Sequence, residues 1–411
     1  MNYGLIGEKL GHSFSREIHE KLGRYAYDLC EIKKDELDAF MTARSFSGIN
    51  VTIPYKTDVI PYLDELSDLA REVGAVNTVV NRGGKLFGDN TDVWGLISLV
   101  RRMRPDLAGL TVLIFGTGGT SRAALAAAKF LGAKKAVRVS RTGRDGALTY
   151  EEAYRDYADA EFLINTTPVG MFPHAGSSPV DLTKFPLLAG VVDAIYNPLN
   201  TRLLLDAKQR GIPAENGLYM LVAQAMKSAE RFTGEPIGDA VTEKIYAELL
   251  FEKRNIVLIG MPGSGKTTLG RLLADKLGRP LVDTDEMIVE RAGIPITEIF
   301  ATKGEDAFRN LESAVIRDLS ETGGRVIATG GGAILREENL EALRSNGILV
   351  YLDRPLGDLL PTSDRPLANR VEKIKTLYVV RRPLYERAAD LTVPVHGAPE
   401  NTVLEILEKL K

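Results

Sequence analysis

A glycine-rich stretch near the middle of the chain, residues 260–267, constrains the fold more than any other feature. It reads Gly-Met-Pro-Gly-Ser-Gly-Lys-Thr and matches the pattern G-x-x-x-x-G-K-[ST]; the apolar run 256–259 precedes it and a helical pattern follows. In this context the loop directs backbone N–H groups and a helix N-terminus at phosphate groups. Lys266 can then reach the terminal phosphates, and the Thr267 hydroxyl can ligate Mg²⁺. The stretch predicts an α/β domain with a parallel sheet that binds a nucleoside triphosphate.

The length of the chain ahead of this loop predicts a second function. Roughly 250 residues precede the loop, which is enough for a separate enzyme. The formal net charge of −3 argues against a nucleic acid or a membrane surface as a partner. Cys30 is the only cysteine, so no disulfide can form within the chain, and a cytoplasmic location is expected. No signal peptide is expected, and no apolar run reaches the roughly 18 residues of a membrane span.

Four short polar motifs occur in order within the first hundred residues. They are H-S-x-S at 12–15, N-V-T-x-P-x-K at 50–56, A-V-N-T at 75–78 and G-D-N-T-D-x-x-G at 88–95. Taken singly, they have simpler interpretations: Ser13 and Ser15 can cap the helix that follows, and Lys56 and Asp92 can form a surface ion pair. As an ordered set, they resemble shikimate dehydrogenase.

This resemblance implies a substrate site and a catalytic pair. The residues implied to bind the hydroxyls and the carboxylate of a shikimate-like substrate are Ser13, Ser15, Thr52, Lys56, Asn77 and Asp92. Lys56 is implied to be catalytic and paired with Asp92. The chemistry agrees, because reduction of a ring ketone needs a proton on the oxygen as hydride reaches the carbon. A lysine beside a carboxylate can supply that proton and stabilise the developing charge.

A second glycine turn, at residues 116–122, predicts a dinucleotide site. It lies between an apolar strand pattern over 110–115 and an alanine-rich helical pattern. Tight glycines before a helix are typical of a turn that sets a pyrophosphate on the helix N-terminus. Ser121 stands where the general fingerprint has its third glycine. The form G-x-G-G-[AT]-S is, however, that of the shikimate dehydrogenase family.

The next strand pattern, 136–140, indicates which dinucleotide binds. It is followed by Arg141 and Arg144, whereas an NAD site places an acidic residue at the strand end for the ribose 2′-hydroxyl. A guanidinium forks onto phosphate, so the pattern favours the 2′-phosphate of NADP. A solvated basic turn is the alternative interpretation.

Three further motifs extend the resemblance. They are N-T-T-P-x-G-M at 165–171, D-x-x-Y-x-P-x-x-T at 193–201 and G-L-x-M-L-x-x-Q at 217–224. Tyr196 and Gln224 are thereby implied to contact the substrate, Ala194 to lie near the nicotinamide, and Gly217 to lie near the cofactor. The full set of expected NADP(H) contacts is Gly116, Thr117, Gly118, Gly119, Thr120, Ser121, Ser140, Arg141, Thr142, Arg144, Ala194 and Gly217.

The resemblance also implies a division of residues 1–253 into two lobes. A substrate lobe is expected over about 1–105 together with 218–250, and a Rossmann lobe over about 106–217, with the site in the cleft between them. No linker rich in Pro, Gly or Ser separates this part from the next, which begins at about residue 254.

Five motifs follow the 260–267 loop. They are D-x-D at 283–285, G-E-x-x-F-R at 304–309, G-G-G at 330–332, R-P-L at 365–367 and R-x-P-L-Y at 381–385. Because side chains alternate along a strand, Asp283 and Asp285 are expected on one face of a strand end. One can hold Mg²⁺ while the other accepts a substrate proton. An ordinary turn and surface arginines are alternative interpretations of the rest, but the ordered set resembles shikimate kinase over residues 254–411.

The second resemblance implies the following roles. Asp285 orients or deprotonates the shikimate hydroxyl, and Arg365 closes over ATP from a lid that is shorter than in relatives, with Pro361 where another basic residue is usual. The expected ATP contacts are Gly263, Ser264, Gly265, Lys266, Thr267, Thr268 and Arg365. The expected shikimate contacts are Asp285, Arg309, Gly331 and Arg381; the expected metal ligands are Thr267 and Asp283; Lys266 and Asp285 are expected to be catalytic.

The two resemblances rest on different residues and name consecutive reactions. We therefore expect a bifunctional enzyme of chorismate and aromatic amino-acid biosynthesis, with NADPH, ATP and Mg²⁺ as cofactors and 3-dehydroshikimate and shikimate as small-molecule substrates. One alternative is a quinate-type or NAD-preferring dehydrogenase in the first part. Another is a kinase-like second part that is weakly active or only binds its ligands, which the shortened lid favours.

Overall fold

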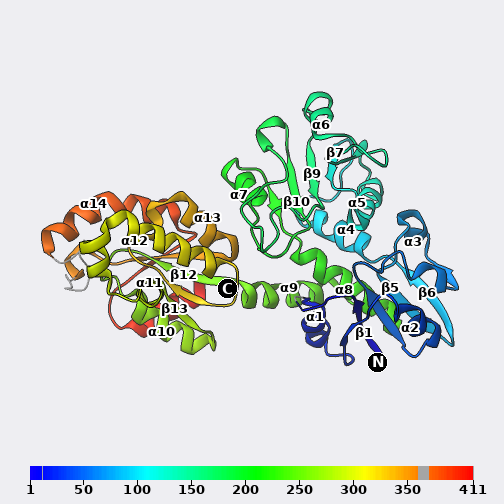
Figure 1. The fold of residues 1–411 in the computed structure, drawn as a ribbon, viewed down its shortest axis with the longest axis horizontal. Helices are drawn as coiled ribbons and strands as arrows, with labels where there is room; N and C mark the ends of the chain where they lie inside the picture. The colour runs from blue at the N-terminus through cyan, green and yellow to red at the C-terminus, as the bar shows by residue number, and fades with distance from the viewer. Residues whose placement is uncertain (12, 360–369, 411) are drawn as a thin grey trace. The chain divides into compact units, whose positions relative to one another are not determined.

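The computed structural model describes residues 1–11, 13–359 and 370–410. The chain divides into two compact units, Met1–Leu250 and Phe251–Lys411 (Figure 1). Both units are α/β, and the predicted fold class is confirmed. In the described ranges, no helix combines the length and the apolar character that a bilayer crossing requires.

The first unit opens with a mixed six-stranded sheet in the order β2-β1-β3-β5-β6-β4. Its strands are β1 (Tyr3–Gly7), β2 (Asp28–Glu31), β3 (Gly48–Val51), β4 (Glu65–Leu66), β5 (Thr78–Arg82) and β6 (Lys85–Asp89). β1 pairs in parallel with β2 and β3, whereas β5 runs antiparallel to β3 and β6. The helices here are α1 (Ser15–Leu22), α2 (Leu37–Ala43), η1 (Ile60–Tyr62), α3 (Asp68–Val73) and α4 (Asp92–Met103).

A five-stranded parallel sheet follows, in the order β11-β10-β9-β7-β8. Its strands are β7 (Thr111–Phe115), β8 (Lys135–Val139), β9 (Phe162–Asn165), β10 (Gly190–Asp193) and β11 (Ala214–Glu215). The helices are α5 (Gly119–Phe130), α6 (Tyr150–Asp156), η2 (Leu182–Lys184) and α7 (Arg202–Gln209). The strand order reverses at β7, between β8 and β9. In such sheets a ligand binds where strands end beside this reversal, which is where the 116–122 turn lies.

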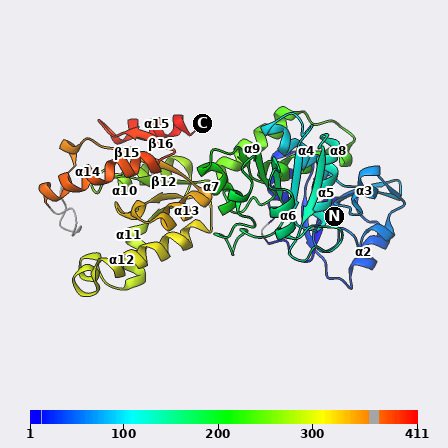
Figure 2. The same cartoon turned by 90° about the horizontal axis from the view of Figure 1, so that it is seen from above.

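After this five-stranded sheet, the chain returns to the first sheet through a long helix. α8 (Leu218–Thr233) packs along α4, and the two helices lie side by side in both views (Figures 1 and 2). α5 packs against α4, so that Leu96, Ala124 and Val222, one from each of the three helices, belong to one buried core. The five-stranded sheet and the first sheet are thereby held together. The last helix of this region is α9 (Asp239–Lys253).

The second unit is built on a parallel sheet in the order β13-β14-β12-β15-β16. Its strands are β12 (Asn255–Ile259), β13 (Leu281–Asp283), β14 (Val326–Ala328), β15 (Gly347–Asp353) and β16 (Leu391–Pro394). β12 is buried on both faces, because Val257 and Ile259 enter one core while Ile256 and Leu258 enter the other. An unbroken apolar run is the expected sequence of such a strand.

Helices cover both faces of this sheet. They are α10 (Lys266–Leu277), α11 (Thr284–Ala292), α12 (Ile296–Ser320), η3 (Ala333–Leu335), α13 (Glu337–Asn346), η4 (Leu356–Asp358), α14 (Val371–Ala388) and α15 (Pro399–Lys409). α12 is interrupted at Gly304, which has φ +80° and ψ 174°. A glycine adopts this conformation without strain, and the helical segment that starts after it carries Arg309 and Glu312.

Candidate active sites

A lysine and an aspartate form an ion pair beside the first sheet. Lys56 lies in the turn after β3, and its Nζ donates to Oδ2 of Asp92 at 2.6 Å. Asp92 is the first residue of α4, where the helix dipole favours a negative charge. The side chains of Lys56 and Asp92 are only 20% and 10% exposed, so they do not form the surface ion pair of the simpler interpretation. An ammonium group held in this way can donate a proton to a bound carbonyl.

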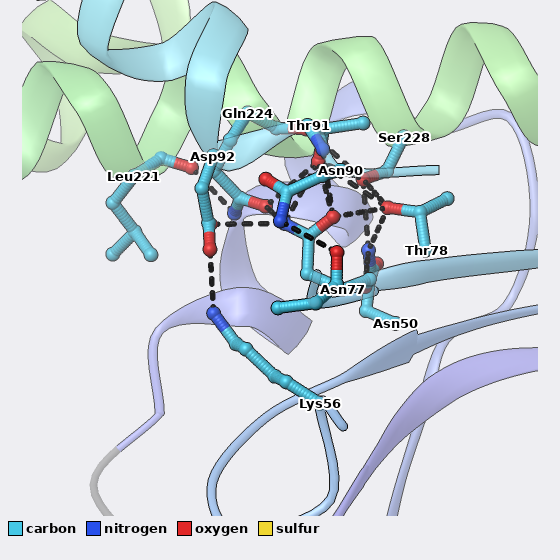
Figure 3. A network of polar contacts seen from close by, with 11 residues as sticks. Asn50, Lys56, Asn77, Thr78, Asn90, Thr91, Asp92, Leu221, Gln224 and Ser228 are labelled. Atoms are coloured by element: carbon cyan, nitrogen blue, oxygen red, sulfur yellow. Dashed lines mark hydrogen bonds and ion pairs between the residues drawn. The ribbon is translucent and has the colours of Figure 1, made fainter. Parts of the chain in front are cut away.

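Asn77 connects this ion pair to α8 (Figure 3). Its Nδ2 donates to Oδ1 of Asp92 at 2.9 Å and to Oε1 of Gln224 at 3.4 Å. Its Oδ1 accepts the Thr91 N–H at 2.7 Å, which fixes the orientation of the amide. The structure thus brings four predicted residues, Lys56, Asn77, Asp92 and Gln224, into one hydrogen-bonded group.

A second layer of polar side chains lies beneath this group. Three of its four members belong to the sequence motifs, but the motifs assigned none of the four a role. Asn50 Nδ2 donates to the hydroxyls of Ser228 at 2.8 Å and Thr78 at 3.1 Å, and the Ser228 hydroxyl contacts that of Thr91 at 2.9 Å. All four side chains are buried. A buried and satisfied polar network holds one geometry. The signals in the sequence were Asn50 at the start of N-V-T-x-P-x-K and Ser228 one helical turn after Gln224.

Three predicted substrate residues, Ser13, Ser15 and Thr52, lie outside the hydrogen-bonded group within the described part of the chain. The helix-cap interpretation of the two serines is wrong: α1 begins at Ser15 without a side-chain cap, and the Ser13 hydroxyl accepts the Ser15 N–H at 3.2 Å. The ring of Phe14, between them, lies 5.4 Å from that of Tyr196. The loop with both serines therefore contacts the loop after β10. Thr52 directly follows β3.

Asp193, at the end of β10, holds the loop that carries Tyr196. It is fully buried, and its carboxylate accepts hydrogen bonds from the Thr201 hydroxyl at 2.6 Å, Asn165 Nδ2 at 2.9 Å and the Ile195 N–H at 3.1 Å. Burial raises the pKa of Asp193 to about 6, although the three donors favour the charged form. The Asp193 side chain therefore connects the ends of β9 and β10, the start of α7 and the loop after β10.

The glycine turn after β7 closes through Ser121. The Ser121 hydroxyl is buried and donates to the Gly116 carbonyl at 2.7 Å, so a serine at this place satisfies the turn itself. Gly116 has φ +121°, and a Cβ there would lie 2.5 Å from the Thr166 hydroxyl. Gly118 is the N-cap of α5 and forms no side-chain cap among the described residues. A helix N-terminus of this kind can bind an anion. The other predicted residues of the turn are Thr117, Gly119 and Thr120.

The remaining predicted NADP contacts lie on two loops. Arg141, Thr142 and Arg144 are exposed after β8, and neither arginine forms an ion pair with another described residue. The Ser140 hydroxyl accepts a backbone N–H of this turn at 3.1 Å. Ala194 and Gly217 lie against each other, because a Cβ on Gly217 would collide with the Ala194 backbone.

In the second unit, the 260–267 loop connects β12 to α10. Gly263 and Gly265 have φ +82° and +93°, the left-handed region that glycine adopts without strain. Lys266 is buried, and its Nζ donates to the carbonyls of the first two loop residues at 2.8 and 2.9 Å. Ser264 is buried within the loop, whereas Thr268 is exposed on the first turn of α10.

The two predicted metal ligands meet directly. The Thr267 hydroxyl donates to Oδ2 of Asp283 at 2.7 Å. The prediction that Asp283 and Asp285 share one face of a strand is wrong, because β13 ends at Asp283 and α11 begins at Thr284. Asp283 instead caps α11 by accepting the Asp285 N–H at 2.9 Å. A hydroxyl beside a carboxylate fits Mg²⁺, which takes few protein ligands besides water and phosphate oxygens.

Three consecutive glycines, residues 330–332, allow the rest of this site to come together. A Cβ on Gly330 would lie 2.7 Å from Asp285 Oδ1 and 2.9 Å from Glu312 Oε1. A Cβ on Gly331 would lie 2.8 Å from Pro262 of the 260–267 loop. A Cβ on Gly332 would collide with the Arg309 guanidinium. A side chain at any of these three positions would therefore displace a neighbouring group, so glycine here allows four side chains to approach closely.

Two buried arginines face this glycine segment. Arg309 Nη1 donates to Glu312 Oε2 at 2.6 Å, and Arg381 Nη1 donates to the Gly331 carbonyl at 3.0 Å. Both arginines are less than one-tenth exposed, so the surface-arginine interpretation does not hold. Burial raises the pKa of Glu312, and the Arg309 charge opposes this shift. No motif singled out Glu312, although its spacing of three residues from Arg309 places both on one helix face.

These residues line one cavity of about 640 Å³, a size typical of small-molecule sites. Its lining includes Lys266, Thr267, Asp283, Asp285, Arg309, Glu312, Gly331 and Arg381. Cations opposite carboxylates in one cavity suit a small substrate that carries both a carboxylate and hydroxyls. Arg365 and Pro361 of the predicted lid lie outside the described residues.

Comparison with known proteins distinguishes the two units. A family model of the shikimate dehydrogenase substrate binding domain matches residues 5–79, and one of shikimate kinase matches residues 262–411. Shikimate dehydrogenase (NADP(+)) of Clostridium perfringens (strain 13 / Type A) is 37% identical over 264 residues, which cover 60% of this chain and 97% of the relative. Shikimate dehydrogenase (NADP(+)) of Geobacillus kaustophilus (strain HTA426) is 38% identical over 257 residues, which cover 57% of this chain and 92% of the relative.

Solved structures give the same result for the first unit. Shikimate dehydrogenase 1 from Peptoclostridium difficile has a TM-score of 0.55 at 37% identity, over 61% of this chain and 98% of that one. A chorismate mutase/shikimate 5-dehydrogenase fusion protein from Clostridium acetobutylicum has a TM-score of 0.57 at 36% identity, over 60% of this chain and 96% of that one. Shikimate 5-dehydrogenase from Thermus thermophilus, in complex with NADP(H) and shikimate, has a TM-score of 0.54 at 30% identity, over 60% and 99%.

The raised pKa of Asp193 predicts how the stability of the first unit depends on pH. Because the folded chain holds this proton more tightly than the unfolded chain, the contribution of Asp193 is present below about pH 4 and is lost as the pH rises to about 6. The loss is on the order of 3 kcal/mol. Denaturant titrations between pH 4 and 7 should show this slope in the wild type and in the exposed control Asp159→Asn. They should not show it in Asp193→Asn, and an unchanged slope there would contradict the assignment.

Proposed function

The chain belongs to the shikimate dehydrogenase family through its first unit and carries a shikimate kinase domain in its second, and we propose that it catalyses two consecutive reactions. The first unit reduces 3-dehydroshikimate to shikimate with NADPH, and the second phosphorylates shikimate with MgATP at its 3-hydroxyl. The observation that carries the proposal is the Lys56–Asp92 ion pair, joined to Asn77 and Gln224. The kinase cavity, lined by a phosphate loop and two buried arginines, supports the second step.

In the reduction, Lys56 is the proton donor. NADPH supplies the hydride to the ketone carbon, and the Lys56 ammonium gives its proton to the ketone oxygen as negative charge develops there. Asp92 orients the lysine, whose Nζ lies 2.6 Å from the Asp92 carboxylate. Asn77 fixes the second Asp92 oxygen, and the Gln224 amide offers a contact to a substrate hydroxyl. Ser13, Ser15, Thr52 and Tyr196 are proposed to complete the substrate site.

The choice of NADP over NAD rests on the turn after β8. Arg141 and Arg144 are exposed and form no ion pair within the described residues, so their guanidinium groups are available to a 2′-phosphate. The turn after β7 would hold the pyrophosphate at the N-terminus of α5. We take about 106–217 as the dinucleotide lobe, and about 1–105 with 218–250 as the substrate lobe.

In the phosphorylation, Arg309 and Arg381 are proposed to bind the shikimate carboxylate. Asp285, which faces the same glycine segment, orients the substrate hydroxyl or accepts its proton. ATP supplies the phosphoryl group, and Lys266 with the loop N–H groups holds the phosphates. Thr267 and Asp283 would hold Mg²⁺, which would neutralise negative charge on the phosphates.

The alternatives are less well supported. The two relatives described above for the first unit are NADP(+) enzymes by name, which does not favour an NAD-preferring quinate enzyme. In the second unit, the residues expected for catalysis line the cavity rather than being replaced, which does not favour a domain that only binds ligands.

Replacing the proposed proton donor should abolish the first reaction and spare the second. We expect Lys56→Ala to lower kcat for 3-dehydroshikimate reduction by about 10²- to 10⁴-fold, the usual worth of a general acid. The exposed Lys34→Ala is the control and should retain the wild-type rate. NADPH oxidation measures the first reaction, and ADP release with added shikimate measures the second. A Lys56→Ala variant that reduces the ketone at the wild-type rate would contradict the role.

Removing the two basic residues after β8 should weaken the binding of NADPH and leave the binding of NADH unchanged. In the double variant Arg141→Ala, Arg144→Ala, we expect KM for NADPH to rise by about tenfold or more, because charge-assisted hydrogen bonds to the 2′-phosphate are lost. Lys134→Ala, an exposed lysine just before β8, controls for general charge. If KM for NADPH and NADH rose equally, these arginines would not read the 2′-phosphate.

A further inference from the structure

Buried polar atoms without a partner mark places where a ligand can complete the structure. Among the described residues, such atoms in the second unit are Ser264 Oγ, Glu312 Oε1 and Arg354 Nε. Ser264 lies in the phosphate loop and Glu312 lines the substrate cavity. Arg354 belongs to none of the motifs, and the proposed mechanism gives it no role.

The fold places Arg354 at the phosphate loop. β15 pairs in parallel with β12, with Tyr351 opposite Ile259, so both strands end at the same edge of the sheet. β12 leads into the loop at Gly260, and β15 leads into Arg354. A Cβ added to Gly265 would lie 3.6 Å from Nη1 of Arg354. The guanidinium therefore lies over the residue that immediately precedes α10.

The charges around this guanidinium are unbalanced. Within residues 1–11, 13–359 and 370–410, no carboxylate forms an ion pair with Arg354. Its neighbour Asp353 is engaged elsewhere, since it accepts from the Tyr351 hydroxyl at 3.0 Å and lies 3.5 Å from Arg382 Nη2. The N-terminus of α10 carries a partial positive charge, and Lys266 adds a full one. Positive groups that converge in this way favour the binding of an anion, and a phosphate chain is such an anion.

We propose that Arg354 is a further nucleotide-binding residue of the second unit, and that its guanidinium binds the phosphate chain of ATP where the chain passes Gly265. The inference rests on the proposed kinase function. A planar guanidinium can donate to two phosphate oxygens at once, whereas a lysine acts as a single point charge. Arg354 thereby fixes the direction of the phosphate chain over the loop, and Lys266 and the loop N–H groups hold it from below.

The test is calorimetric titration of the full chain with MgADP and, separately, with tripolyphosphate plus Mg²⁺. Arg354→Ala should weaken both ligands by about tenfold or more, the effect of losing charge-assisted hydrogen bonds. Arg354→Lys should recover part of the loss. Arg271→Ala, on the exposed face of α10, is the matched control and should bind both ligands like the wild type. Shikimate affinity should be unchanged in all three variants, which also shows that the substrate site is folded.

Three results would count against the inference. Binding of MgADP by Arg354→Ala within about threefold of the wild type would overturn it. A loss of MgADP binding with unchanged tripolyphosphate binding would also overturn it, because the contact would then be to the nucleoside. A wild-type chain that binds neither ligand would remove the kinase proposal, and this inference with it. If Arg354→Ala fails to fold, wild-type affinity for both ligands in Arg354→Lys would refute the bidentate contact.

Discussion

Parallel strands that are buried on both faces leave their carboxyl ends as the place for chemistry. β7, β9, β10 and β12 are buried throughout or nearly so, and most of their side chains are apolar and pack into the core. The polar groups of the sites are therefore concentrated at the ends of the strands and in the residues that follow them. In the first unit the glycine turn, Asp193 and the two arginines lie at such ends. In the second unit the phosphate loop, Asp283, the 330–332 glycines and Arg354 do so.

The two sites satisfy their buried charges differently. In the first unit, Asp92 is bonded through both oxygens, to Lys56 and to Asn77, and a layer of hydroxyls and amides supports it from below. This site is preorganised by its own side chains. In the second unit, Glu312 and Arg354 each keep a buried polar atom without a partner in the described residues. Glu312 lines the substrate cavity, where a small substrate can complete it, and we propose that a phosphate chain completes Arg354.

The sequence predicted most of what depends on ordered motifs and little of what depends on single side chains. The α/β class and the position of the phosphate loop follow from local patterns that need no tertiary information. The shared strand face of Asp283 and Asp285 was a wrong prediction, because a helix begins between them. Asn50 begins a motif, and Ser228 and Glu312 lie one helical turn from motif residues, but these positions alone do not reveal what their side chains bind. Each becomes significant only when another element brings its partner within hydrogen-bond distance.

We propose that one chain makes shikimate and then phosphorylates it. The most direct measurement is ADP release by the full chain from 3-dehydroshikimate, NADPH and MgATP, with a matched reaction that omits NADPH. We expect ADP only when NADPH is present, and we expect Asp285→Asn to release little ADP while it oxidises NADPH at the wild-type rate. NADPH oxidation without ADP release by the wild type, or ADP release that does not depend on NADPH, would contradict this proposal.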